Sequence, residues 1–420
     1  MHLKVPYNWD ADLLQIYAGI NHDPETRYRV CEVYASDQKA IIGTGRAPSS
    51  LPVRKGHYRE HIGEAHRHGL RFSFVFNACS MAGREFSPET QSQFYAYLHE
   101  LVDAGLDGLI ITMPYLAHLV HRWFPALTIS SSVNNQLTSV EKIAQLQASA
   151  PFSRIQFPFT RARDFNLFRE AAARFPEYDR IALVNESCLP DCAFQRFHQD
   201  YYNFGDVRDG AIDYYHLCCA LQKLEDPLNV LKAQWVMPED LHHLADAGIT
   251  TVKLAGRDRK DNLWLTELVA SYARGRSCGN VYRFVEKSGL LDPEWSRLLG
   301  ADLTPCHYQV DSAKLNGFIE GFVRGDLPCV RNKSCSPACN WCAGFMGAVT
   351  PPPNRDERLQ QVRQLMALVE QRMYTPGGGC IGGLPRVCSG AVRPASGACS
   401  GAEIRGAPQA ASPGLQGPLS

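Results

Sequence analysis

The sequence predicts an α/β fold, a (β/α)8 TIM-like barrel with a small cysteine-rich C-terminal extension and a disordered tail. Short apolar runs typical of strands alternate with amphipathic runs typical of helices, which is the pattern of parallel sheets joined by crossover helices. About eight strand-like runs occur, and a helix-like run follows most of them. This number favours a closed barrel, with a doubly wound open sheet as the alternative.

The two kinds of run can be assigned by their periodicity. The expected strands are Gln15–Ala18, Arg29–Ala35, Arg71–Asn77, Gly108–Met113, Leu127–Ser131, Ser153–Phe157, Arg180–Val184 and Thr250–Leu254. The expected helices between them include Tyr58–His68, Gln91–Ala104, Tyr115–Trp123, Val140–Ala148 and Phe165–Phe175.

The domain organisation follows from where this alternation stops. Residues 1–300 are expected to form the barrel core, and residues 301–374 a helical, cysteine-rich extension. From Thr375 to Ser420 the chain is rich in glycine, has no aromatic residue and no lysine, and carries Glu403 as its one acid. Such a composition is typical of a disordered tail, and we expect its three cysteines not to be ligands.

Composition limits the classes of function. The 43 basic and 43 acidic side chains balance, so no global field attracts nucleic acid or membrane, although a local basic groove leaves nucleic acid open as a partner. The amino terminus lacks the pattern of a secretory signal, and no apolar run is long enough for a membrane span. We therefore expect a cytoplasmic protein whose 15 cysteines stay reduced and serve metal, cluster or redox chemistry.

The stretch from Leu183 to His198 concentrates chemistry at a strand end. Cys188 and Cys192 lie in a C-x3-C spacing whose intervening Pro and Asp form a turn, a poor place to bury thiols for packing alone. Soft thiolates suit an iron–sulfur cluster or zinc, whereas any single cysteine is more often a small core residue. Downstream, Cys218 and Cys219 are adjacent, so only one of them can readily face a shared site if the segment is extended.

A second cysteine group closes the extension. Cys329, Cys335, Cys339 and Cys342 fall within fourteen residues, which indicates a tetrathiolate site for a second iron–sulfur cluster or for a single zinc ion.

Basic and amide side chains at predicted strand ends are candidates for binding a substrate. Arg46, in a glycine-rich turn, offers a planar fork to a carboxylate or phosphate, or simply belongs to a tight turn. Asn77 follows one strand and Arg257 another, while Arg196 lies near the cysteine pair. Lys253 lies within a buried strand, where it needs either a salt-bridge partner or an anionic ligand.

Taken together, these residues resemble the collagenase-like peptidase family U32. The resemblance is carried by four segments in the same order: Val184–His198, Trp235–Leu241, Gly248–Arg257 and Cys329–Cys342. It implies a barrel core and a four-iron four-sulfur (4Fe–4S) cluster. It also implies either oxygen-independent hydroxylation, in ubiquinone synthesis or on RNA, or the collagen-degrading activity of the older family name.

The resemblance also suggests ligands for the cluster. Cys188 and Cys192 correspond best to the cluster ligands of the family, and Cys218 or Cys219 is the candidate for the third ligand. Cys79 and Cys31 are candidates for the fourth ligand, which stays open. Some hydroxylation proteins that this sequence resembles locally work in pairs, so a hetero-partner of the same family is worth considering.

Three functions remain open at this point. The first is an iron–sulfur-dependent hydroxylase or modification enzyme acting on a small molecule, peptide or RNA, in which Glu186 and His198 handle protons. The second is a peptidase that pairs Cys188 with His198, since the chain lacks H-E-x-x-H and its nearest string, His99–Asp103, ends in aspartate. The third is a non-catalytic scaffold in which both cysteine groups hold structural zinc.

Overall fold

Eight parallel strands close into a barrel in the computed structural model, which describes residues 1–37, 40–43, 57–190, 192–201, 213–257, 259–277, 279–286 and 293–371. The strands follow one another in chain order, and β1 pairs with β8 to close the ring. They are β1 (His2–Pro6), β2 (Val30–Ala35), β3 (Arg71–Phe76), β4 (Gly108–Ile111), β5 (Thr128–Ser131), β6 (Arg154–Gln156), β7 (Asp179–Leu183) and β8 (Thr251–Lys253). The predicted barrel is confirmed, and the closing pair rules out an open sheet.

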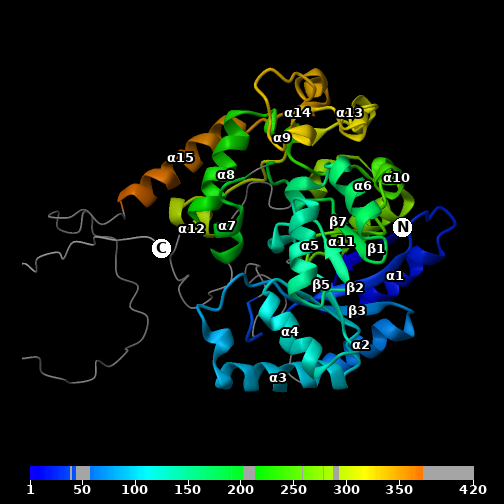
Figure 1. Ribbon diagram of the computed structural model, residues 1–420. Helices are drawn as coiled ribbons and strands as arrows, with labels where there is room; N and C mark the ends of the chain where they lie inside the picture. The colour runs from blue at the N-terminus through cyan, green and yellow to red at the C-terminus, as the bar shows by residue number, and fades with distance from the viewer. Residues whose placement is uncertain are drawn as a thin grey trace, which may run out of the picture. The chain divides into compact units, whose positions relative to one another are not determined.

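Helices connect the strands, and most of them lie around the outside of the barrel (Figure 1). They are α1 (Asp12–His22), α2 (Tyr58–Arg67), α3 (Pro88–Asp103), α4 (Pro114–Trp123), α5 (Val140–Ser149), α6 (Phe165–Arg174), α7 (Gln195–Tyr201), α8 (Tyr214–Glu225), α9 (Asn229–Lys232), α10 (Leu241–Asp246) and α11 (Asn262–Arg274). Across the described part of the chain, none of the helices has the length and apolar character that a membrane crossing requires.

The first strand was missed by the sequence pattern. The expected strand Gln15–Ala18 is wrong, because these residues lie within α1, whose buried Leu13, Leu14 and Tyr17 have helical spacing. The actual first strand buries Leu3 and Val5 against the helices and turns the charged Lys4 into the barrel. A buried lysine in the middle of the strand hides the apolar run on which the prediction depended.

The interior of the barrel contains a buried ionic network centred on Glu32 of β2. The Glu32 carboxylate lies 2.5 Å from Lys4 Nζ of β1 and 2.7 Å from Arg154 Nη1 of β6, and it accepts a hydrogen bond from Ser73 Oγ of β3. Lys4 and Glu32 are at most 1% exposed. Arg154 also lies 3.4 Å from Asp179 at the start of β7. Charged side chains from four strands and a hydroxyl group from β3 therefore meet inside the barrel.

The C-terminal segment packs onto the barrel helices. It comprises α12 (Pro293–Leu299), β9 (Gln309–Val310), α13 (Glu320–Arg324), α14 (Pro328–Arg331), β10 (Val349–Thr350) and α15 (Arg355–Gln371). Helix α15 packs on α8, where Val362 and Leu365 share an apolar cluster with Leu217, and α13 and α14 contact α6. Residues Met1–Met373 form one compact unit. The domain boundary at residue 300 stays a prediction, and the tail from residue 375 lies outside the described residues.

Replacing Glu32→Gln tests the network. Burial alone would raise the pKa of Glu32, but Lys4 and Arg154 hold it well below its ordinary value of 4.5. The amide would leave the buried Lys4 without its carboxylate and Arg154 with only Asp179 at 3.4 Å, so we expect the free energy of unfolding in urea at pH 7 to fall by ~3–5 kcal/mol. A carboxylate with a depressed pKa stabilises the fold above its unfolded-state pKa and loses that contribution as the pH falls. The difference between wild type and variant should therefore shrink below about pH 4.

The matched control is Glu60→Gln. Glu60 pairs with His57 at 2.8 Å, but its side chain is 72% exposed. Its loss should change stability by no more than ~0.5 kcal/mol. Equal effects of the two variants would contradict a structural role for the buried network.

Candidate functional site

The end of β7 is held in place by a buried asparagine. Asn185 accepts a hydrogen bond from Ala255 N at 2.7 Å and donates to the backbone oxygens of Ala255 and Phe284 at 3.1 and 3.2 Å. It is fully buried. Because these contacts join the end of β7 to the segment that follows β8, Asn185 fixes the start of the loop that carries Cys188. Asn185 lies in the stretch from Leu183 to His198 that the sequence singled out, but its anchoring role was not predicted.

Cys188 lies over the carboxyl end of the barrel. It packs against an apolar cluster of Val133, Phe159, Leu183 and Ala255, which come from the ends of β5, β6, β7 and β8. Burial raises the pKa of the Cys188 thiol well above its ordinary value, and the charges of Glu186, Cys219 and Cys192 raise it further. Cys192 and Cys219 are therefore close enough to Cys188 to act on it electrostatically, and these three residues are called the mouth thiols.

Lys223 supports the mouth thiols, and sequence reasoning missed it. Its ammonium group donates to Ser187 Oγ at 2.7 Å and lies 3.6 Å from Glu286 Oε2. Burial by itself lowers the pKa of Lys223, but Cys219 and Glu286 raise it well above the usual value, which keeps this lysine charged. The one sequence signal was its spacing, since Lys223 follows Cys219 by four residues on α8 and shares its face.

The other candidate ligands lie apart from this group. The segment with Cys218 and Cys219 is helical, so the two side chains point in different directions, and Cys218 hydrogen-bonds Tyr214. Burial, followed by the charge of Asp200, raises the pKa of Cys79 to about 12, with Arg196 as the opposing cation. Cys31 lies on β2, where it accepts a hydrogen bond from Arg71 and donates to Leu3 O.

The cysteines of the extension form a second group. Burial, together with Cys342, Cys335 and Cys339, raises the pKa of Cys329 to about 11, so the four thiols are electrostatic neighbours. Their loop is tied to the segment after β6, because Lys333 Nζ lies 2.6 Å from Asp164 Oδ2. These four residues, Cys329, Cys335, Cys339 and Cys342, are called the extension thiols below.

A buried guanidinium lies beside the extension thiols. Arg163 is 1% exposed and donates to Trp235 O at 2.6 Å and to Leu231 O at 2.7 Å. Burial lowers the pKa of Arg163 to about 10, and the nearby Cys342 opposes this shift. A metal–thiolate centre carries negative charge, which a buried cation would offset.

The donor atoms of the two cysteine groups decide whether they fit a metal ion or a cluster. Among the residues that the structure describes, no group of three or more His, Cys, Asp or Glu side chains is arranged to hold a metal ion. The donors themselves are of the right kind, since soft thiolates select zinc and iron–sulfur centres. The extension thiols would supply all four ligands of a tetrathiolate site. The mouth thiols would supply three ligands.

The two residues predicted to handle protons take different positions. Glu186 belongs to the loop of the mouth thiols and acts electrostatically on Cys188. His198 lies on α7, where its Nε2 is 3.2 Å from Asp213 Oδ2 and its ring stacks on His216. The charged groups acting on Cys188 are Glu186, Cys219, Lys223 and Cys192. The thiol–imidazole pair of a cysteine peptidase is therefore not among the contacts described for these residues.

Three of the predicted substrate-binding residues gather at the carboxyl end of the barrel. Lys253 Nζ lies 3.4 Å from Gln156 Oε1 and 4.4 Å above the ring of Tyr34, and Arg257 lies 5.4 Å from the same ring. Asn77 accepts a hydrogen bond from Ser132 Oγ at 2.8 Å. Arg196 is exposed on α7. Arg46 lies outside the described residues.

Two buried polar atoms near these side chains lack a protein partner. Within the described part of the chain, Gln156 Nε2 and Asn134 Oδ1 make no hydrogen bond, although Gln156 is fully buried and Asn134 is 4% exposed. Such groups destabilise a fold unless a ligand or water satisfies them. They mark the carboxyl end of the barrel as a place where a polar ligand would bind.

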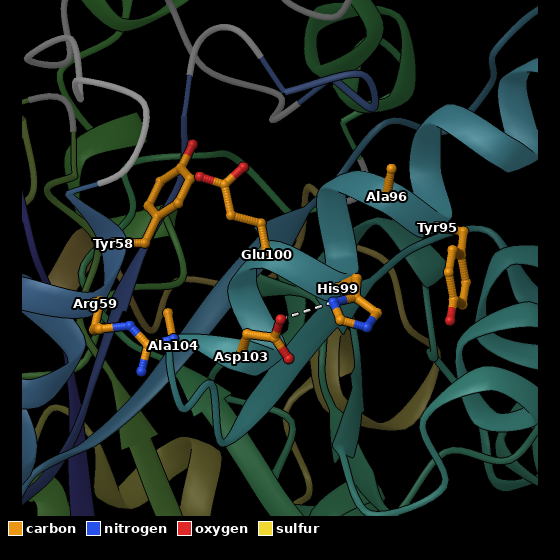
Figure 2. Close-up of a pocket in the computed structure, with 8 residues that line it drawn as sticks. All are labelled: Tyr58, Arg59, Tyr95, Ala96, His99, Glu100, Asp103 and Ala104. Atoms are coloured by element: carbon orange, nitrogen blue, oxygen red, sulfur yellow. Dashed lines mark ion pairs between the residues drawn. The ribbon is translucent and has the colours of Figure 1, made fainter.

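A cavity of about 530 Å³ lies elsewhere, between α2 and α3 on the outside of the barrel (Figure 2). His99 and Asp103 line it and pair with each other at 2.9 Å, four residues apart on α3. The string His99–Asp103 therefore lies on an outer helix, away from the strand ends, and does not form a zinc peptidase site.

Comparison with known proteins identifies related sequences. Residues 26–158 match the sequence model of peptidase family U32. The uncharacterized protease MJ1657 of Methanocaldococcus jannaschii is 23% identical over 313 residues, which cover 74% of this chain and 85% of that protein. The family match confirms the resemblance drawn from the sequence.

Solved structures superpose on parts of the chain. The U32 peptidase Mk0906 gives a TM-score of 0.44 at 14% identity, covering 61% of this chain and 93% of its own. The YdjI aldolase from Escherichia coli K12 gives a TM-score of 0.33 at 9% identity, covering 69% and 90%.

Alkylation rates test the state of the thiols. At pH 7 a pKa of about 12 leaves Cys79 with roughly a thousandth of the thiolate of a cysteine at the ordinary value of 9.0. We expect iodoacetamide, followed by peptide mass mapping of metal-free protein, to label the exposed Cys335 first. Cys79 and Cys188 should react at least about tenfold more slowly, after allowance for the higher nucleophilicity of a more basic thiolate. Faster labelling of Cys188 than of Cys335 would contradict this and indicate an activated nucleophile.

Proposed function

From the match of residues 26–158 to the model of peptidase family U32, we propose that this chain is an iron–sulfur-dependent redox enzyme of the oxygen-independent hydroxylase or modification type. The observation that carries the proposal is the position of Cys188 over the carboxyl end of the barrel, with Cys192 and Cys219 close enough to act on it electrostatically. Catalytic groups of (β/α)8 barrels gather at that end. The fourth ligand is left unassigned.

The surroundings of the mouth thiols suit a bound cluster. Without one, burial and mutual repulsion keep Cys188 protonated, whereas a bound metal would favour the thiolate. When bound, an iron–sulfur cluster supplies one-electron redox chemistry. The charged Lys223 lies beside Cys219, where it would lower the cost of negative charge on the sulfur atoms. Asn185 holds the loop that presents Cys188.

The substrate would bind beside the thiols, over the strand ends. Lys253 and Arg257 would hold an anionic or polar group there, and the unpartnered Gln156 Nε2 would donate to it. Glu186 is the candidate for proton transfer, because it lies in the thiol loop. The His198–Asp213 pair on α7 would act only on a substrate that reaches the rim. A small molecule, a peptide and RNA all remain substrates to test.

The peptidase alternative has less support from the contacts. A cysteine nucleophile needs a base within reach and a lowered pKa, whereas the pKa of Cys188 is raised and His198 pairs with Asp213. Structural zinc is a second candidate for the extension thiols alone, since four cysteines on one loop complete a tetrathiolate site. Zinc there would be compatible with redox chemistry at the mouth thiols.

Metal analysis of matched variants tests the proposal. The full chain is purified without oxygen, and its iron, sulfide and zinc contents are measured together with its visible spectrum. We expect a brown protein with ~4 iron and ~4 sulfide per cluster, whose colour fades in air. The double variant Cys188→Ala, Cys192→Ala should lose the iron and sulfide of the mouth site, while Cys335→Ala, Cys339→Ala should lose the metal of the extension.

The control is Cys31→Ala, which removes a thiol that bonds to Arg71 and Leu3 and lies outside both groups. It should keep the metal content of the wild type. A colourless wild type that contains only zinc, or no metal, would overturn the redox function and leave the peptidase or the scaffold. Equal metal loss in all three variants would show that the assignment of ligands is wrong.

A further inference from the structure

A second cavity, of about 480 Å³, lies where the segment after β8 meets the start of the C-terminal extension. Its volume is in the range of small-molecule sites. Arg259, Arg283 and His307 line it together with Trp264 and Asn280, and its described lining contains no carboxylate. From these walls we infer that the cavity binds the phosphate group of a small ligand.

The two guanidinium groups are held in position before any ligand arrives. Arg259 lies 4.9 Å above the ring of Trp264, and Arg283 lies 4.6 Å from the ring of Phe284. Arg283 Nη2 also lies 2.5 Å from Glu267 Oε2, on α11. Because stacking and pairing restrict these side chains, less conformational entropy is lost when an anion binds between them.

Unsatisfied nitrogen atoms point to a missing acceptor. Arg283 Nε and His307 Nδ1 are buried and make no hydrogen bond within the described part of the chain. Two buried nitrogens without partners are costly, and the oxygen atoms of a phosphate would satisfy both. Burial lowers the pKa of His307, Glu286 raises it and Arg259 lowers it, so the imidazole and the Arg259 guanidinium, from distant parts of the chain, lie close enough to act on each other electrostatically.

The position of this cavity, beside the loop that follows β8, also favours phosphate binding. Arg259 follows β8, and its backbone oxygen accepts a hydrogen bond from the buried Asn8 at 3.1 Å, which anchors this loop to the segment after β1. Loops after the last strands of (β/α)8 barrels frequently bind phosphate groups. A dianion with several oxygens matches two arginines and an imidazole better than a carboxylate does. This site is separate from the cysteine groups and does not depend on the proposed function.

Phosphate binding by the full chain is the test. Inorganic phosphate is titrated at constant ionic strength and followed by ³¹P NMR line broadening and calorimetry, with acetate as the carboxylate comparison. We expect saturable binding of phosphate, weaker binding of acetate, and a loss of phosphate affinity of about ten- to a hundredfold in Arg259→Gln. His307→Phe, which removes a ring nitrogen donor and leaves both arginines, should also weaken binding.

The control is Arg276→Gln, which removes an arginine that is 64% exposed and pairs with Glu25 outside the cavity. It should bind phosphate like the wild type, and circular dichroism should show that all variants are folded. Ribose 5-phosphate should displace inorganic phosphate, whereas a short RNA, whose phosphates are diesters, should not. Absence of saturable binding, equal losses in Arg259→Gln and Arg276→Gln, or displacement by RNA alone would overturn the site.

Discussion

The barrel depends on the charge balance around Glu32. The carboxylate on β2 contacts its neighbours β1 and β3 and also β6 on the other side of the ring, and it is stable there because Lys4 and Arg154 are buried with it. Removing one partner would leave charge in a place that water does not reach. The network therefore stabilises one register of the strands relative to others, in addition to the preference that apolar packing gives.

This charged interior lies toward the starts of the strands, and the carboxyl ends are built differently. There Lys253, Gln156 and Asn77 mix with aromatic and apolar side chains, and two polar atoms, Gln156 Nε2 and Asn134 Oδ1, have no partner among the described residues. The division is physically reasonable, because a satisfied ionic network stabilises a scaffold, whereas unsatisfied groups are tolerated where a ligand completes them. The mouth thiols lie over this less satisfied end.

Much of the fold could be read from periodicity. Seven of the eight strands fall where apolar runs predict them, but β1 was missed because its central residue, Lys4, faces inward and interrupts the run. Of the candidate site, the sequence pointed to Cys188 and Cys192 and left Cys218 and Cys219 as alternatives for the third ligand, and the structure puts Cys219 of α8 nearer to the pair. Almost nothing in the sequence indicated that Lys223 is buried beside the thiols, since a lysine on an amphipathic helix is ordinarily exposed.

The sequence by itself determined the alternation of strands and helices, the family resemblance and the concentration of thiols in two segments. These are local properties, set by side-chain periodicity and by the spacing of residues along the chain. Only the tertiary structure decided that the ring closes, that His198 pairs with Asp213, and that Arg259 and His307 share a cavity. Such contacts join residues far apart in the chain, and their partners are chosen by packing and burial, which no local pattern encodes.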